Sequence, residues 1–284
     1  MLPATDVFVD GVRSAVYQAG DARMTEAVVF LHGNPGPMDD WEDMAPACAE
    51  VGRVVAVDMP GFGRAEHPRR FDFSIQGYAR HLAGVLDQLQ LQRVHLVAHD
   101  FGAAWGAQWA VDHPGALASI TLINPLPLCA DFEWHFFAKL WQTPVVAELL
   151  QLCTSAVSIG YVMNRDNPRR LPSAFIERVA SHYDWQQAVG VNKLYRATRD
   201  VARTLGPLGE SLRALDPPAC IIWGTADRYA PVRYAEKMRQ LFTQAELHLI
   251  DHSGHWPFVD EPQAVRQLVC SFVSRQLRPS GHER

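Results

Sequence analysis

Asp100 is a candidate nucleophile because of the residues around it. It follows an apolar run at 94–98 (VHLVA) and is flanked by the small residues Ala98 and Gly102. This pattern predicts a strand, a sharp turn and a helix in close contact. A carboxylate attacks esters and amides poorly, but it displaces well at strained or activated sp3 carbon, such as that of an epoxide or an alkyl halide. The product is an alkyl ester of Asp100, which water must then cleave.

Cleavage of such an ester needs a general base and a group that orients it. His255 follows the last apolar run and comes directly after Gly254, which allows a tight loop; His252 is the competing histidine nearer the strand end. Asp227 follows the apolar run at 220–223. The run at 120–123 is followed by Asn124, which carries no charge. We therefore expect His255 as the base and Asp227 as its orienting acid.

Hydrolysis of the ester also requires donors for the negative charge that develops on its carbonyl oxygen. We expect these oxyanion-hole donors to be the backbone N–H groups of Phe101, which follows the nucleophile, and Asn34, which lies in the run 32–36 (HGNPG). Phe101 also opens a helix, whose N-terminal dipole favours an anion and keeps Asp100 ionised.

These residues are placed by a chain in which apolar runs alternate with helical patterns. The apolar runs lie at 7–9, 15–17, 27–31, 54–57, 94–98, 120–123, 220–223 and 247–250. The helical patterns lie at 41–51, 75–89, 103–112, 232–242 and 263–276. Strands that are apolar on both faces and alternate with helices predict a mostly parallel sheet covered on both sides.

One aromatic-rich segment, 126–216, breaks this alternation because it has helical spacing and no convincing β run. We interpret it as a helical cap inserted after the sixth strand, with residues 1–125 and 217–284 forming the core domain. Such an insertion would cover the carboxyl ends of the strands, where ligands bind in open α/β sheets.

The motifs together resemble the epoxide hydrolase and haloalkane dehalogenase branch of the α/β-hydrolases. The matching segments are 32–35 (HGNP), 58–63 (DMPGFG), 99–102 (HDFG), 223–227 (WGTAD) and 254–256 (GHW). The resemblance implies the α/β-hydrolase fold, an eight-stranded and mostly parallel sheet with helices on both faces and a helical lid after strand six. It also implies a catalytic triad of Asp100, Asp227 and His255.

Within this branch the substrate depends on residues near the nucleophile. Haloalkane dehalogenases typically hold the halide with the indole N–H of a tryptophan directly after the nucleophile, often with the Asn of the HGNP motif. This chain has Asn34, but Phe101 has no N–H donor. A tryptophan of the lid, Trp134, Trp141 or Trp185, could replace it. Our candidate substrate-binding residues are these three and Trp256.

Epoxide hydrolases instead need acids in the lid that protonate the opening oxygen. Tyrosine suits this role because its ordinary pKa keeps it protonated at neutral pH. Tyr195, in the segment 192–196 (NKLYR), resembles such a late-lid tyrosine. His135, in the segment 132–137 (FEWHFF), resembles the early-lid histidine of one subgroup. We therefore expect Tyr195 and His135 as the ring-opening pair.

Composition and simple motifs limit the classes of partner, location and cofactor that we expect. A net charge of -5 argues against a nucleic-acid partner, and no stretch is long and apolar enough to cross a bilayer. The N-terminal residues lack a secretion signal, and the five scattered cysteines suggest reduced thiols, so we expect a cytoplasmic protein. No metal-ligand spacing or nucleotide-binding motif occurs, and we expect no cofactor. A homodimer is left open.

The leading hypothesis from the sequence is an epoxide hydrolase that converts a small apolar epoxide and water to a vicinal diol. One alternative is a haloalkane dehalogenase, which Asn34 supports and Phe101 weakens. A second is a non-catalytic small-molecule-binding protein that keeps the fold; the set of Asp100, Asp227 and His255 argues against it.

Overall fold

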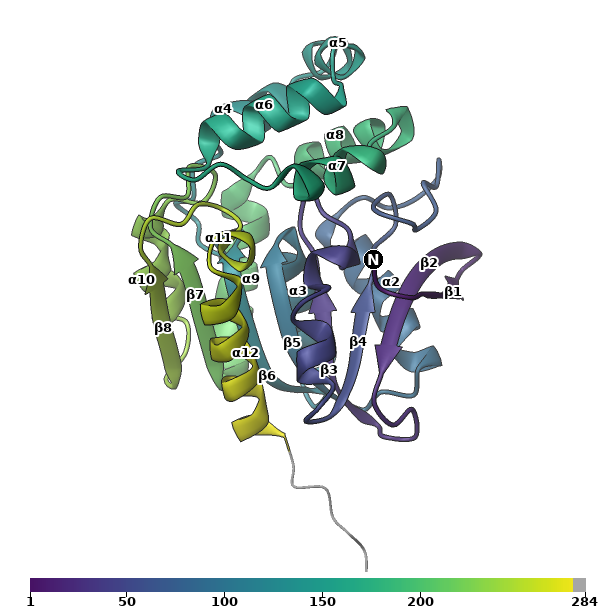
Figure 1. Cartoon of the computed structure of the whole chain (residues 1–284), viewed down its shortest axis with the longest axis vertical. Coiled ribbons are helices and arrows are strands. Elements are labelled where there is room, and N and C mark those ends of the chain that lie inside the picture. The colour runs from purple at the N-terminus through teal and green to yellow at the C-terminus, as the bar shows by residue number, and fades with distance from the viewer. Residues whose placement is uncertain (278–284) are drawn as a thin grey trace, which may run out of the picture.

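A computed structural model describes residues 1–277 and shows one eight-stranded sheet (Figure 1). The strand order is β1-β2-β4-β3-β5-β6-β7-β8, in which β2 runs antiparallel to both its neighbours and all other pairs are parallel. The expected mostly parallel sheet is confirmed. The strands are β1 (Thr5–Val9), β2 (Val12–Ala19), β3 (Glu26–Leu31), β4 (Arg53–Val57), β5 (Arg93–Asp100), β6 (Leu117–Pro125), β7 (Ala219–Gly224) and β8 (Ala245–Ile250).

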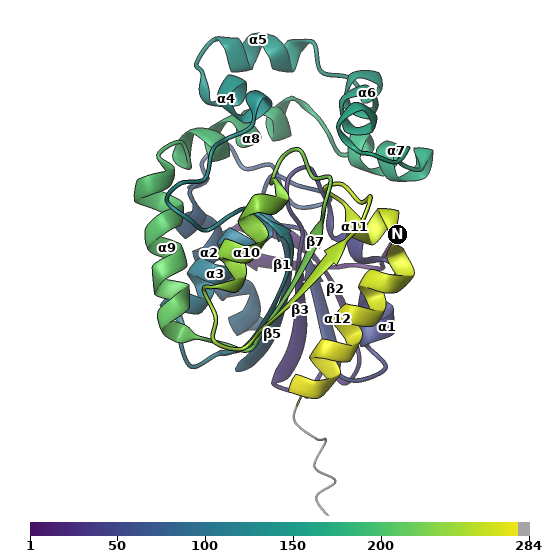
Figure 2. The same ribbon diagram turned by 90° about the vertical axis from the view of Figure 1, so that its left-hand side faces the viewer.

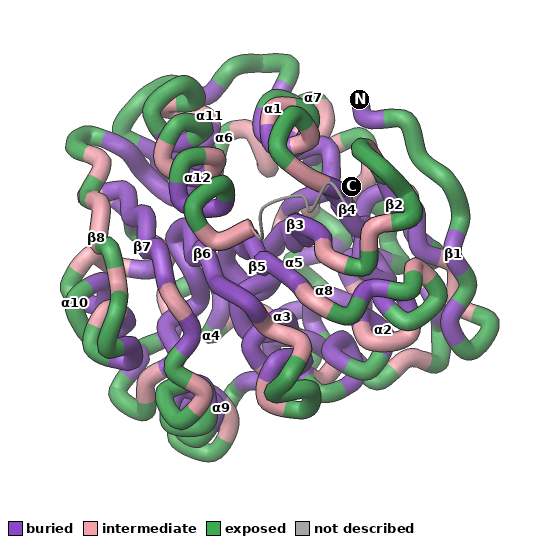
Figure 3. The backbone as a smooth tube through the Cα atoms, turned by 90° about the horizontal axis from the view of Figure 1, so that it is seen from below, coloured by how far each residue is buried: buried purple, intermediate pink, exposed green. Residues whose placement is uncertain are grey.

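Helices cover both faces of the sheet, and each face has its own hydrophobic core (Figure 2). Alternate residues of β3 show why: Val29 and Leu31 pack into one core, whereas Val28 and Phe30 pack into the other. One core is closed by α2 (Ile75–Gln88), α3 (Phe101–Asp112), α9 (Val201–Leu215) and α10 (Ala235–Arg239). The other is closed by α1 (Ala45–Cys48), α11 (Pro257–Asp260) and α12 (Pro262–Gln276). Seen from below, the buried strands run between these helices (Figure 3).

Two of the expected helices are shorter in the structure. The pattern at 41–51 forms a 3-10 turn, η1 (Met38–Trp41), and the four-residue α1, because Pro46 has no N–H for a continuous helical ladder. The pattern at 232–242 likewise divides into η2 (Val232–Tyr234) and α10.

Five helices lie above the carboxyl ends of the strands, and we call them the cap (Figures 1 and 2). They are α4 (Phe136–Gln142), α5 (Val146–Leu152), α6 (Ala156–Asp166), α7 (Ser173–Ser181) and α8 (Trp185–Ala197). The expected cap range, 126–216, also includes α9, which packs against α3 beside the sheet. The expected core range, 217–284, includes residues 278–284, which lie outside the described part.

Local sequence sets several of these helix starts. The Ser74 side chain accepts a hydrogen bond from the backbone of Gly77 at the start of α2, and Asp184 caps α8 in the same way. Ser155 and Ser158 form a reciprocal capping box at the start of α6. Within residues 1–277 no single helix is long and apolar enough to span a membrane; α5 and α6 reach that length only together, across a bend of 110°.

Candidate active site

Asp100 lies at a strained turn between β5 and α3, with φ 47° and ψ −121°. Such a conformation is costly for a residue with a side chain and is retained when its surroundings hold it there. Two glycines make room for it. A Cβ on Gly102 would lie 2.4 Å from the carbonyl oxygen of His32, and one on Gly33 would lie 2.4 Å from the Cβ of Asp100. The sequence pattern indicated the need for Gly102 but not for Gly33.

The two carboxylate oxygens of Asp100 have different surroundings. Oδ1 accepts a hydrogen bond from the backbone N–H of Asn34 at 2.9 Å, whereas Oδ2 lies 3.7 Å from Nε2 of His255. Burial raises the pKa of Asp100, and the charge of His255 and the N–H groups of Asn34 and Phe101 oppose that rise. Oδ1 therefore faces the backbone N–H of Asn34, one of the two expected oxyanion-hole donors, while Oδ2 faces the expected base.

Asp227 is held more completely than Asp100. Its Oδ2 pairs with Nδ1 of His255 at 2.7 Å and accepts from Nδ2 of Asn124 at 2.6 Å. Its Oδ1 accepts from the backbone N–H groups of Tyr229 at 2.7 Å and Ala230 at 3.0 Å. With both oxygens engaged, Asp227 is suited to orient the imidazole rather than to attack a substrate.

Asn124 is a residue of the site that the sequence reasoning passed over because it carries no charge. Besides donating to Asp227, its Nδ2 lies 3.3 Å from the carbonyl of Gly254, and its Oδ1 accepts from the backbone of Gly224 at 3.0 Å. It thus joins the ends of three strands around the acid. The sequence did offer one sign of this role, because Asn124 stands at the end of β6 just as Asp100 and Asp227 follow the apolar runs of β5 and β7.

His255, and not His252, is the histidine that the structure brings to Asp100 and Asp227. His252 is exposed and its backbone bonds to Thr225. Burial lowers the pKa of His255, but the charge and hydrogen bond of Asp227 and the charge of Asp100 outweigh burial, so the net shift is upward. The proton on Nδ1 is directed at Asp227, which leaves Nε2 toward Asp100 as the basic nitrogen.

Tyr195 of α8 reaches the same site from the cap. Its hydroxyl accepts a hydrogen bond from Nδ2 of Asn34 at 3.2 Å. Because that bond uses a lone pair, the hydroxyl proton remains for another acceptor. Burial, followed by the charge of Asp100, raises the pKa of Tyr195 well above its ordinary value. The side chain is therefore held protonated beside Asp100.

His135 caps the start of α4 and lies near Tyr195, with ring centroids 6.3 Å apart. Its Nδ1 accepts from the backbone N–H of Ala138 at 3.3 Å, so the neutral ring must carry its proton on Nε2. Burial lowers the pKa of His135 to about 4. It is thus a neutral N–H donor at physiological pH.

An apolar cavity of about 300 Å³ joins these groups. Its lining residues come from the strand ends and from the cap: Asn34, Pro35, Asp100, His135, Phe137, Trp141, Leu150, Cys153, Thr154, Ser158, Ile159, Val162, Met163, Tyr183, Val191, Tyr195, Tyr229, His255 and Trp256. This is the size and polarity of a small-molecule site.

The four candidate substrate-binding tryptophans divide into two pairs. Trp141 and Trp256 line the cavity. Trp134 is absent from the lining because it stacks on Phe101 and donates its indole N–H to the carbonyl of Thr198 at 3.2 Å. Trp185 is also absent and is 50% exposed on α8.

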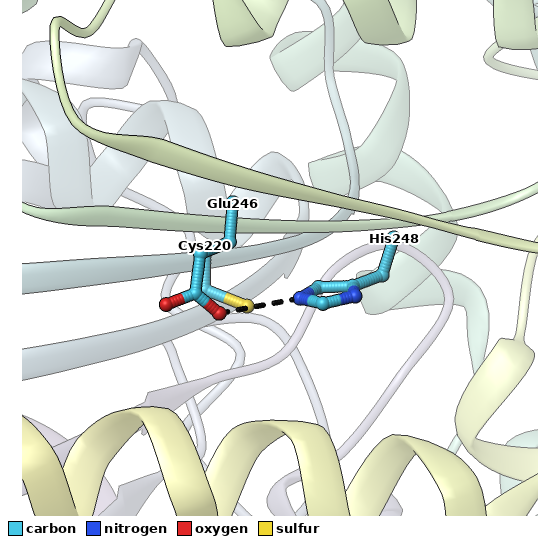
Figure 4. A group of neighbouring side chains, drawn as sticks. All are labelled: Cys220, Glu246 and His248. Carbon is cyan, nitrogen blue, oxygen red and sulfur yellow. Dashed lines mark hydrogen bonds and ion pairs between the residues drawn. The ribbon is translucent and has the colours of Figure 1, made fainter.

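A second group of chemically active side chains lies on β7 and β8, toward the amino ends of these strands and away from the cavity. The ligand-type atoms of Cys220, Glu246 and His248 are within 4.8 Å of one another (Figure 4). However, Glu246 already bonds to the Arg275 guanidinium at 2.5 Å and to His248 at 3.3 Å. Burial, with the charge of Glu246, raises the pKa of the Cys220 thiol to about 12. We therefore interpret this group as ion-paired side chains at the edge of the sheet, separate from the cavity.

Comparisons with known proteins agree with this architecture. Residues 26–262 match the family described as the alpha/beta hydrolase fold. The chain is 25% identical over 279 residues to the 2-hydroxy-6-oxo-2,4-heptadienoate hydrolase of Pseudomonas putida F1, covering 95% of this chain and 96% of that protein.

Two solved structures share the fold at low sequence identity. The haloalkane dehalogenase DbeA of Bradyrhizobium elkani has a TM-score of 0.84 at 20% identity, over 96% of this chain and 98% of that chain. The meta-cleavage product hydrolase CumD of Pseudomonas fluorescens has a TM-score of 0.80 at 20% identity, over 95% and 97%. Since the family match spans most of the sequence, this chain belongs to the α/β-hydrolase fold family.

Proposed function

We propose that this hydrolase is an epoxide hydrolase that acts through a covalent ester of Asp100. The observation that carries the proposal is the pairing of two groups across one cavity. Oδ2 of Asp100 lies at the cavity 3.7 Å from Nε2 of His255, and the Tyr195 hydroxyl, held by Asn34, keeps its proton for a substrate. A nucleophile and an acid on one small cavity are what opening of an epoxide ring requires.

In the first step Oδ2 of Asp100 attacks an epoxide carbon, and the bond from that carbon to the ring oxygen breaks. The ring oxygen takes the proton of the Tyr195 hydroxyl, which is easier to release once the charge of Asp100 is lost, while the Nε2–H of His135 donates a hydrogen bond to it. The result is a hydroxyalkyl ester on Asp100 and a tyrosinate.

In the second step His255, oriented by Asp227, takes a proton from water as the water attacks the ester carbonyl of Asp100. The oxyanion forms on Oδ1, where the N–H groups of Asn34 and Phe101 stabilise it. Collapse releases the diol oxygen, which takes the proton from His255. The remaining proton of the new carboxylic acid returns to Tyr195, so one epoxide and one water give one diol.

Neutral and apolar substrates fit the cavity best. Its lining, drawn from the described residues 1–277, contains no arginine or lysine that would pair with a substrate carboxylate. The curated relative from Pseudomonas putida is named for a dienoate, which is an anion. A difference in the charge of the substrate is therefore expected between the two proteins.

The surroundings of Asn34 favour an epoxide over an organohalide. One of the two N–H groups of its side-chain amide donates to Tyr195, which leaves only the other for a halide. Phe101 has no N–H, and the nearby Trp134 has its N–H bonded to Thr198. Dehalogenation is thus an alternative outcome of the test below rather than a second proposal.

The test is to trap the intermediate with the variant His255→Gln. After mixing with a panel of terminal alkyl epoxides, intact-mass spectra should show an adduct of one epoxide, mapped by peptide analysis to Asp100. His252→Gln is the matched control, since this exposed histidine is three residues away, and it should turn over normally. An adduct only with haloalkanes, with halide release, would indicate a dehalogenase; no adduct with either panel would refute the ester mechanism.

A further inference from the structure

The loop that carries His255 is anchored from below by the ends of three strands. His99 of β5 donates from Nε2 to the carbonyl of His255 at 2.9 Å. After β7, the backbone N–H of Ala226 donates to the carbonyl of Ser253 at 2.9 Å. Asn124 of β6 reaches the carbonyl of Gly254. These contacts fix the loop relative to the sheet.

A second anchor, Asp260 at the end of α11, holds the same loop from its other side. Its Oδ2 accepts from the hydroxyl of Ser253 at 2.9 Å and from the backbone N–H of Gly254 at 2.8 Å. Its Oδ1 accepts from Nδ2 of Asn167 at 2.9 Å. Asp260 therefore binds the catalytic loop with one oxygen and the segment after cap helix α6 with the other.

Asn167 also packs directly on the loop. A Cβ on Gly254 would lie 1.9 Å from Oδ1 of Asn167 and 2.8 Å from Cδ of Pro168, so the cap segment fills the space that a side chain at 254 would need. Asn167 is buried although it lies outside the core of the sheet. The cap and the loop are thus in close contact.

The neighbouring residue of the cap touches the site on a different side. Asp166, the last residue of α6, accepts from the hydroxyl of Tyr229 at 3.1 Å. The Tyr229 ring lies 5.2 Å from the His255 ring, and its backbone N–H bonds to Asp227. Two consecutive cap residues therefore support the surroundings of His255.

We propose that Asn167 and Asp260 are positioning residues for His255, through which the cap sets the rate of hydrolysis of the Asp100 ester. This inference rests on the proposed function. It predicts an effect on only one step, because Asp100, Tyr195 and Asn34, which open the ring, make no hydrogen bond to either residue. His255 is needed as a base only in the second step.

The test uses Asn167→Ala and Asp260→Asn and measures the two steps separately by rapid quench and intact mass. Each variant should slow ester hydrolysis about 10-fold or more while changing ester formation less than about 2-fold. During steady turnover, a larger fraction of each variant than of the wild type should therefore be present as the Asp100 ester. Far-UV circular dichroism and thermal unfolding check that each variant is folded.

A swapped pair provides the sharpest check. In Asp260→Asn the new amide can keep its oxygen toward Ser253 and Gly254, but its NH₂ then faces the NH₂ of Asn167. Adding Asn167→Asp replaces that donor with an acceptor and restores the bond to residue 260 in reverse, although it loses the bond from Nδ2 of Asn167 to the carbonyl of Arg169. The double variant should hydrolyse the ester faster than either single variant, which two independent losses of stability would not produce.

The control is Glu261→Gln, which removes an ion pair with Arg169 beside Asp260 and leaves the loop contacts in place. It should change neither step. Equal slowing of both steps, no slowing, or no recovery in the swapped pair would overturn the inference while leaving the ester mechanism intact. Absence of any ester in the His255→Gln variant would instead overturn the proposed function itself.

Discussion

The floor and the roof of the cavity differ in how their polar atoms are held. On the floor, Asp100, Asp227 and His255 follow strand ends and bond to one another or to backbone N–H groups. In the roof, the polar groups bond within the cap. The hydroxyl of Thr154 donates to Leu150 O at 3.1 Å. The hydroxyl of Ser158 donates to Ser155 O at 3.0 Å, and that of Tyr183 bonds to Gln151.

This difference indicates a division of labour. The floor presents directed polar groups and is suited to the chemistry, whereas the roof presents mainly apolar surface and is suited to the choice of substrate. Tyr195 and His135 are the exceptions in the roof, because Tyr195 is tied to the floor through Asn34 and His135 keeps an N–H for the substrate. Changes in the floor should therefore alter rates strongly, and most changes in the roof should alter selectivity modestly.

The largest effect is expected for Asp100→Asn on the floor. An amide is a far weaker nucleophile than a carboxylate, so kcat/KM for epoxides should fall about 10⁴-fold or more, with no covalent adduct in mass spectra. Asp227→Asn is the informative partner, because it should still form the ester and fail in its hydrolysis. Substantial activity of Asp100→Asn would place the nucleophile elsewhere.

The next effect separates Tyr195 from the rest of the roof. Tyr195→Phe removes the acid and should slow ester formation about 10²-fold in single-turnover experiments. Tyr183→Phe is the matched control, since this tyrosine also lines the cavity but its hydroxyl bonds to Gln151. It should retain activity to within about 3-fold. Equal losses in the two variants would remove the distinction between them.

A pH experiment tests the coupling of His255 to Asp100. The negative charges of Asp227 and Asp100 raise the pKa of His255. Ester formation moves this charge from Asp100, 3.7 Å from Nε2 of His255, to the Tyr195 oxygen in the cap, so we expect the pKa of His255 to fall in the intermediate. Below that pKa the imidazole is protonated and hydrolysis should fall about tenfold per pH unit. The acid limb for hydrolysis of the preformed ester should thus lie below the pKa that NMR titration gives for the free enzyme; a limb at higher pH would contradict this coupling.

The smallest effect is expected in the apolar roof. Ile159→Ala removes three carbons from the lining on α6 and should lower kcat/KM for long-chain epoxides about 5-fold, with little change for short ones. Val157→Ala, on the same helix but 82% exposed, is the control and should show no chain-length effect. A uniform loss for all chain lengths in Ile159→Ala would argue that the roof shapes the chemistry as well.

Much of the floor could be predicted because its residues follow strands with strong apolar patterns. Parallel strands align their carboxyl ends, so a residue just after a strand is predicted to lie near others in the same position. This placed Asp100, Asp227 and His255 at one edge. The same reasoning neglected Asn124, since an uncharged side chain gives no sign of the carboxylate that it holds.

The roof was less predictable because helical spacing alone does not determine which face of a helix points inward. Of the three candidate tryptophans in the expected cap range, the cavity includes Trp141 but neither Trp134 nor Trp185. Which face is buried depends on how the five cap helices pack on one another and on the sheet.

The sequence by itself determined that a carboxylate stands at the turn between β5 and α3, because that depends only on the residue type and its small neighbours. Only the tertiary structure decided which distant residues meet there. Asn34 and Tyr195 are 161 residues apart, and Asn167 and Asp260 are 93 apart. Such pairs form when the cap folds back over the strand ends, and no local pattern in either segment encodes the partner.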